Sequence, residues 1–157
     1  MELEEKIVNE LQEKKYTLTT AESCTGGLLA GRILNVSGAS AVYNEGHITY
    51  SNAAKERLLG VPHETLVQYG AVSEQTAAEM ALGAAKTANA NVALSTTGIA
   101  GPTGGTSEKP VGLVYVGCCY NGLVTVEECH FTGDREQNRN AAVEAALQLL
   151  WKTLSNS

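Results

Sequence analysis

The eight residues from Thr20 to Gly27 read TAESCTGG and place a serine and a cysteine between a carboxylate and two glycines. The preceding run YTLTTAES favours a strand, and the following TGGLLAGRILNVSG favours a helix entered through Thr25. The motif therefore predicts a strand end that turns into a helix N-terminus, whose free N–H groups can hold an anion or an oxyanion. Whether Ser23 attacks a substrate, or whether the hydroxyls only cap the helix, stays open at this point. Cys24 is expected to pack as a small apolar side chain, because no base lies beside it in the sequence.

A second group of reactive side chains lies in SGASAVYNEGHITYSNAAK, which carries Ser40, Tyr50 and Lys55. A serine hydroxyl is a weak nucleophile unless a base takes its proton, and a lysine kept neutral by desolvation can be that base. If a strand over residues 42–50 ends at Tyr50 and a helix begins at Asn52, Lys55 can reach back across the strand end. The alternative is that Lys55 is an exposed residue of a short helix, and spacing alone does not choose between them.

Two further stretches have the composition of anion-binding segments. STTGIAGPTGGTSEKP follows a buried strand, where α/β sheets place their ligands, although it matches neither GxGxxG nor a P-loop. A glycine-rich turn without a ligand is the alternative. FTGDREQNR places Arg135 and Arg139 at the start of the last helix, where an arginine is unfavourable unless it faces an anion such as a phosphate. An ordinary ion pair of Arg135 with Asp134 or Glu136 is the alternative there.

The elements that must position these side chains alternate between helix and strand. Helices are expected over residues 2–14, in NAAKERLLG, from a capping-box pattern at Ser73, and in DREQNRNAAVEAALQLLWKTL. NVALSTTG reads as a buried strand, and VGLVYVGCCY and LVTVEECHF form a hairpin at Asn121-Gly122, a dipeptide that suits a type I′ turn. This order predicts a single domain over residues 1–157 of the α/β class, in three layers around a mixed sheet.

Composition excludes some classes of function. The chain has 157 residues and a formal net charge of -6, which argues against a broad nucleic-acid surface and thus against a nucleic-acid partner. Its four cysteines lack the paired spacing of a zinc site and are expected to be reduced thiols. No apolar stretch approaches the roughly 18 residues of a membrane span, and no signal-peptide core is present, so a cytoplasmic protein without a membrane partner is expected.

Taken in order, TAESCTGG, YSNAAKERLLGV, GAVSEQTAAEMA, STTGIAGPTGGTSEKPVGLVYV and FTGDR resemble the CinA C-terminal domain family over about residues 5–154. The resemblance is in particular to its stand-alone nicotinamide-nucleotide amidases, also called NMN deamidases or PncC enzymes. It implies a three-layer α/β/α sandwich with a mixed, mostly five-stranded sheet. It also implies hydrolysis of the carboxamide of nicotinamide mononucleotide to nicotinate mononucleotide and ammonia, in pyridine nucleotide recycling, by a serine–lysine mechanism without a metal or cofactor.

The resemblance also assigns residues. Ser40 and Lys55 match the nucleophile and the base, with Tyr50 beside them, and Ser23, Thr97 and Arg135 match other active-site positions. Whether Ser23 or Ser40 attacks is left open. Further residues expected to bind the nucleotide substrate are Thr25, Gly26, Gly98 and Gly101.

Two questions remain about assembly and activity. A homodimer is the default expectation for a compact α/β enzyme. The alternatives to the amidase are a non-catalytic paralogue that binds a nucleotide or a protein in competence or DNA-damage responses, and an amidase of the same mechanism for another carboxamide.

Overall fold

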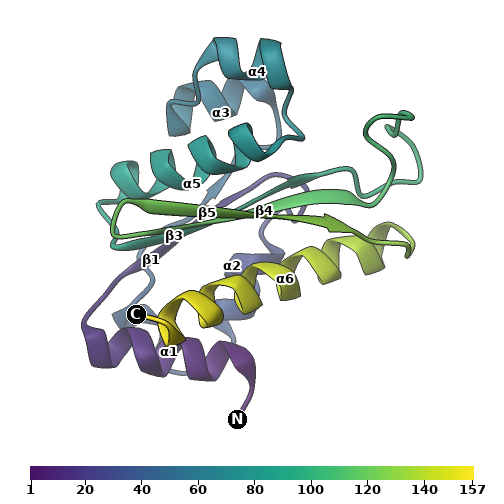
Figure 1. Cartoon of the computed structure of the whole chain (residues 1–157). Coiled ribbons are helices and arrows are strands. Elements are labelled where there is room, and N and C mark those ends of the chain that lie inside the picture. Colours follow the sequence, from purple (N-terminus) through teal and green to yellow (C-terminus); the bar gives the residue numbers. More distant parts are fainter.

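The computed structural model describes residues 1–157 as a five-stranded sheet with helices on both faces (Figure 1). The strands are β1 (Leu18–Glu22), β2 (His47–Ile48), β3 (Val92–Gly98), β4 (Leu113–Tyr120) and β5 (Leu123–His130). They lie in the order β2-β1-β3-β4-β5, with β1 parallel to β2 and β3, and with β3, β4 and β5 antiparallel to one another. The expected α/β sandwich with a mixed, five-stranded sheet is confirmed.

The helices form two layers. One face of the sheet carries α1 (Leu3–Lys14), α2 (Leu28–Leu34) and α6 (Arg135–Ser155); the other carries α5 (Glu74–Ala88), with α3 (Asn52–Leu59) and α4 (His63–Tyr69) packed on its outer side (Figure 1). The apolar stripe expected on the first helix is core, because Ile7, Val8 and Leu11 are fully buried. On the other face, a Cβ atom at Gly83 would lie 1.8 Å from the Leu59 carbonyl oxygen, so α3 and α5 approach closely only because this residue is glycine.

The strand expected over residues 42–50 is mostly absent. Only His47 and Ile48 form β2, and a short 3-10 helix, η1 (Ala39–Ala41), precedes them. Tyr43 makes one isolated bridge to Leu18, and its hydroxyl then bonds Thr20 Oγ1 at 2.7 Å. The chain pairs with β1 at Tyr43 and again only from His47, and the Tyr43 hydroxyl fills the space beside Gly46 between these two points.

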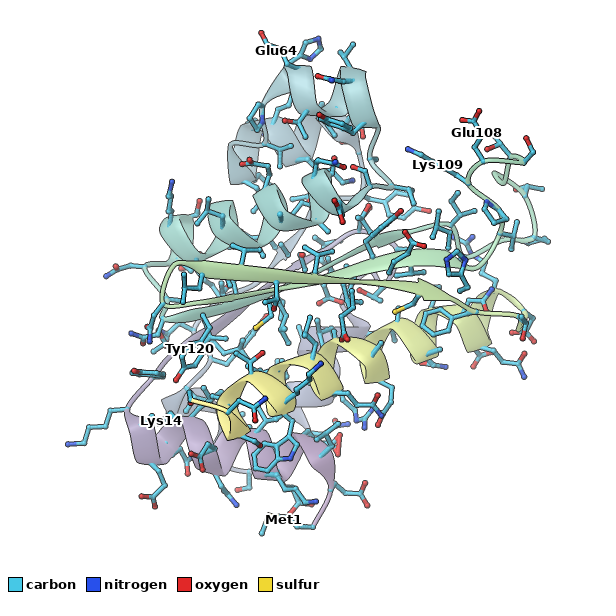
Figure 2. All side chains as sticks on the ribbon, viewed as in Figure 1. Met1, Lys14, Glu64, Glu108, Lys109 and Tyr120 are labelled. Atoms are coloured by element: carbon cyan, nitrogen blue, oxygen red, sulfur yellow. The ribbon has the colours of Figure 1, made fainter.

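The hairpin between β4 and β5 forms as expected. Asn121 and Gly122 have φ values of 49° and 87°, and a type I′ turn requires positive φ at both central positions. The glycine-rich stretch between β3 and β4 leaves the sheet as a projecting loop, on which Figure 2 shows Glu108 and Lys109. Lys109 Nζ donates to the Tyr69 carbonyl at the end of α4, so the loop is anchored to the helical layer. None of the helices combines the length and the apolar character needed to cross a membrane.

Candidate active site

A cavity of about 260 Å³ lies beside the carboxyl ends of the parallel strands β1 and β3. This is the edge of an α/β sheet where ligands bind. Five of the lining residues are apolar and the others carry hydroxyl, amine or guanidinium groups or are glycine. The lining residues are Ser23, Cys24, Tyr50, Lys55, Ala71, Val72, Thr97, Gly98, Ala100 and Arg135.

Ser23 and Lys55 meet in this cavity. The Nζ atom of Lys55 lies 3.0 Å from the Oγ atom of Ser23 and 2.8 Å from the Thr49 carbonyl oxygen. Lys55 stands on the first turn of α3, whose start is capped by the Ser51 hydroxyl accepting from the Ala54 N–H. The side chain therefore reaches back across the end of β2. This is the arrangement predicted for a functional Lys55, and the alternative of an exposed lysine is wrong.

The Lys55 amine is kept away from water. Lys55 is 1% exposed, and burial lowers the pKa of its ammonium from 10.5 to about 8. With this pKa, roughly a tenth of the lysine is neutral at pH 7, and about half at pH 8. When neutral, it donates to the Thr49 carbonyl and turns its lone pair toward the Ser23 hydroxyl, which is the geometry of a general base.

The Cys24 thiol, in contrast to the Lys55 amine, is held in its protonated form. Burial raises the pKa of its thiol to about 11, although Arg139 and Lys55 act in the other direction. The thiol stays protonated at neutral pH and is a poor nucleophile. The expectation that Cys24 is a packed side chain agrees with its 6% exposure, although it also lines the cavity.

The turn after β1 is built around the buried carboxylate of Glu22, a residue that sequence reasoning missed. This carboxylate accepts from the N–H groups of Gly27, Leu29 and Ala30 at 2.9 to 3.1 Å, and from the Thr25 hydroxyl at 2.6 Å. Glu22 thus satisfies the free N–H groups at the start of α2, and the expected hydroxyl cap from Thr25 is absent. The acidic residue just before the serine was the available signal, and an anion-binding role for this helix end is excluded because a carboxylate already occupies it.

Arg135 and Tyr50 stand together among the lining residues. Arg135 donates from Nη1 to the Gly101 carbonyl at 2.8 Å and from Nη2 to the Tyr50 hydroxyl at 3.3 Å. Both residues are exposed, and Arg135 retains further N–H donors for an anion. Neither Asp134 nor Glu136 pairs with it, so the ion-pair alternative is excluded; Asp134 instead caps α6 in a capping box.

The remaining expected residues divide into two groups. Thr97 and Gly98 line the cavity, and the Thr97 hydroxyl donates to the Ala71 carbonyl at 2.8 Å. Thr25, Gly26 and Gly101 do not line it. Thr25 is fully buried and bonded to Glu22 and to Thr96, so its hydroxyl is unavailable to a ligand.

The expected pairing of Ser40 with Lys55 is corrected. Ser40 is exposed in η1, does not line the cavity and makes no hydrogen bond to Lys55. The Leu18 N–H donates to the Val42 carbonyl, which places η1 at the amino end of β1, whereas Ser23 follows its carboxyl end. The five residues of β1 separate these two ends by roughly 15 Å.

Two further features were missed by sequence reasoning. Ala71 and Val72 supply an apolar wall to the cavity from the connection between α4 and α5, and no local pattern marked them. Arg139, noted in the sequence only for its place in the last helix, donates to the carbonyl oxygens of Cys24 and Thr25.

Comparisons with known proteins agree with this architecture. The family model described as the CinA C-terminal domain matches residues 1–154. A crystal structure of a competence/damage inducible protein from Agrobacterium tumefaciens superposes with a TM-score of 0.94 at 45% identity, covering 98% of this chain and 93% of that one. A CinA superfamily protein from Klebsiella pneumoniae gives a TM-score of 0.95 at 36% identity, covering 99% of this chain and 97% of that one.

Curated relatives are longer. A CinA-like protein from Kosmotoga olearia is 55% identical over 152 residues, which are 97% of this chain and 37% of the relative. A protein from Clostridium acetobutylicum, whose name describes competence-damage induction, is 56% identical over 154 residues, or 98% of this chain and 38% of the relative. This chain thus spans less than two fifths of the length of these relatives. The match of the family model over nearly every residue shows that the chain belongs to the CinA C-terminal domain family.

Proposed function

We propose that this chain hydrolyses the carboxamide of nicotinamide mononucleotide to nicotinate mononucleotide and ammonia, with Ser23 as the nucleophile and Lys55 as the base. The observation that carries the proposal is the contact of 3.0 Å between the buried Lys55 amine and the Ser23 hydroxyl. A pKa of about 8 for Lys55 suits a group that takes and returns a proton near neutral pH.

In the first half of the reaction, Ser23 Oγ forms a bond to the carboxamide carbon and its proton passes to Lys55 Nζ. The carbonyl electron pair moves onto the oxygen, which becomes an oxyanion. When this pair returns, the C–N bond breaks, and the leaving nitrogen takes the proton from Lys55 and departs as ammonia. The product of this half is an ester between Ser23 and the nicotinate mononucleotide.

In the second half, a water molecule attacks the ester carbon and gives a proton to Lys55. The bond between Ser23 Oγ and the carbon then breaks, and Lys55 returns the proton to Ser23. Lys55 is neutral at the start and at the end of each half. A base with a pKa far from the working pH would take up or release this proton slowly.

The cavity supports a substrate with an aromatic carboxamide at one end and an anionic group at the other. Ala71, Val72 and Ala100 provide apolar contact for a ring in this cavity of about 260 Å³. The ribose and phosphate then extend toward the exposed Arg135, whose unused N–H groups suit a phosphate.

The test is ammonia release from nicotinamide mononucleotide by the wild type and by Ser23→Ala and Ser40→Ala. These replacements remove the same atom from two serines, one beside Lys55 and one exposed about a strand length away. Release is expected to fall by at least about a thousandfold in Ser23→Ala, which lacks the nucleophile, and to stay near wild type in Ser40→Ala. Full activity of Ser23→Ala would overturn the assignment of the nucleophile, and an inert wild type would overturn the function.

The names of the relatives favour one alternative, a binding role in competence or damage responses without turnover. It predicts that the wild type binds nicotinamide mononucleotide in calorimetry yet releases no ammonia. Turnover of a different carboxamide, with nicotinamide mononucleotide inert, would instead identify an amidase of another substrate.

A further inference from the structure

One arginine from the last helix holds the turn that carries Ser23. Arg139 donates from Nε to the Cys24 carbonyl oxygen at 2.9 Å and from Nη2 to the Thr25 carbonyl oxygen at 3.2 Å. The Ser23 carbonyl accepts from the Gly26 N–H at 3.2 Å, which closes the turn. Three successive carbonyl groups therefore have donors, and the orientation of each peptide plane between them is set.

A peptide N–H points opposite to the carbonyl of its own plane. The Cys24 N–H shares a plane with the Ser23 carbonyl, which faces into the turn, so this N–H faces outward. It has no acceptor in any other residue, and Cys24 is 6% exposed and lines the cavity. A nearly buried N–H without a partner costs free energy, and such groups persist where a ligand supplies the acceptor.

Strand β3 supplies a second N–H at the same place. The Ser23 N–H donates to the Thr96 carbonyl at 3.0 Å, the last bond from this end of β1 to β3. Along β3, the backbone N–H groups that face β1 recur at every second residue. After Thr96, the next N–H that faces this way is that of Gly98, which lies beyond the end of β1. The pairing of β1 with β3 ends at Glu22 and Thr96, so this N–H has no strand partner in β1, and Gly98 lines the cavity.

We propose that Arg139 is a positioning residue for catalysis. Its bond to the Thr25 carbonyl fixes the peptide plane that carries the Gly26 N–H, and this N–H holds the Ser23 carbonyl, whose plane carries the Cys24 N–H. The Cys24 N–H is thereby aimed at the oxyanion, beside the Gly98 N–H. The oxyanion is the carboxamide oxygen after the Ser23 Oγ–C bond has formed, when the carbonyl electron pair has moved onto it and Lys55 holds the serine proton. This inference rests on the proposed function and names the donors that function requires.

Arg139 acts through the turn and not on the substrate. Its guanidinium faces the turn carbonyls, and Arg139 is absent from the residues that line the cavity. Two N–H groups fixed in advance stabilise charge that develops only in the transition state, so their misplacement lowers kcat more than substrate affinity. Arg139 therefore differs in its expected effect from Arg135, which lines the cavity and is expected to act on binding.

The experiment compares Arg139→Met, Arg139→Lys and the control Arg32→Met for ammonia release from nicotinamide mononucleotide. Arg32 lies on the same helical layer but pairs with Glu4 and Glu144 instead of turn carbonyls. Arg139→Met is expected to lower kcat by about 10- to 100-fold with KM within about twofold, because one donor is misaimed rather than deleted. Arg139→Lys, which can hold one of the two carbonyls, is expected to fall between Arg139→Met and the wild type, and Arg32→Met to keep the wild-type kcat.

A second measurement separates positioning from folding and from binding. The probe is the aldehyde analogue of nicotinamide mononucleotide, which Ser23 converts into a tetrahedral hemiacetal by the same proton transfer to Lys55. Arg139→Met is expected to weaken its binding by the factor lost in kcat. In a Ser23→Ala background, Arg139→Met is expected to leave the Kd of nicotinamide mononucleotide itself unchanged.

Two outcomes would overturn the role of Arg139: a kcat of Arg139→Met equal to that of Arg32→Met, or a loss of affinity in Arg139→Met that is equal for the aldehyde and for the substrate. Each of these requires an active wild type and leaves the amidase function standing. A wild type that releases no ammonia would instead overturn the amidase function and this inference together.

Discussion

The Nζ atom of Lys55 lies 3.0 Å from the Oγ atom of Ser23, a contact that joins α3 on one side of the sheet to the turn before α2 on the other. The contact crosses the carboxyl end of β1. The strand ends at Glu22, so the Lys55 side chain occupies the space beyond its last residue. Burial of the lysine and proximity of the serine therefore have the same structural origin, and several measurements follow from it.

Under the proposed function, the pH dependence of catalysis should report the protonation state of Lys55. Because the lysine must lose its proton before it can accept one from Ser23, kcat/KM is expected to rise with pH and to level off above about 8. Initial rates of ammonia release across about pH 6 to pH 9.5 measure this profile. A rate that does not change over this range would contradict the role of Lys55 as base.

Stability should depend on the same proton. The folded protein releases the Lys55 proton near pH 8, whereas the unfolded chain keeps it to about pH 10.5, so unfolding takes up a proton between these values. The free energy of unfolding of the wild type, relative to Lys55→Met, is therefore expected to rise by about 1 to 2 kcal/mol from pH 7 to pH 9.5. Urea unfolding of both proteins at the two pH values measures the change, and a constant difference would count against a depressed lysine pKa.

Glu22 is expected to be important for folding of the turn. Its carboxylate accepts three backbone N–H groups and one hydroxyl, and a glutamine would present an NH₂ group to some of these donors. Glu22→Gln is expected to lower the free energy of unfolding by about 2 kcal/mol. The matched control is Glu5→Gln, an exposed residue of α1, which should change it little; equal stabilities of the two variants would show that the carboxylate is not required.

Arg135 is expected to recognise the phosphate. Arg135→Met should lower kcat/KM for nicotinamide mononucleotide by about 10- to 100-fold, the usual loss for charged hydrogen bonds. For nicotinamide riboside, which lacks the phosphate, the same replacement should have little effect. Arg57→Met, which removes an exposed arginine of α3 outside the cavity, is the control. An equal loss for both substrates would mean that Arg135 acts on the carboxamide end instead.

Local sequence patterns predicted the elements with local causes. The apolar stripe of α1, the Asn121-Gly122 turn and the alanine-rich α5 all depend on residues within a few positions of one another, and all three are present. The prediction of a strand over residues 42–50 was wrong because the Tyr43 hydroxyl bonds Thr20 and both side chains lie against Gly46, and Thr20 belongs to a distant part of the sequence. The predicted hydroxyl cap of α2 was wrong because the Glu22 carboxylate, which precedes the helix, accepts from the N–H groups of Leu29 and Ala30 at its start.

The sequence by itself determined the succession of helices and strands, the family, and a short set of residues that included both serines and the lysine. Only the tertiary structure decided which serine lies beside Lys55. Ser23 and Ser40 occupy opposite ends of β1, and which end faces Lys55 depends on the parallel register of β1 with β2, where Glu22 pairs with Ile48. The register of paired strands arises from packing between distant segments, and the positions of Arg139 at the turn and of Ala71 at the cavity arise in the same way.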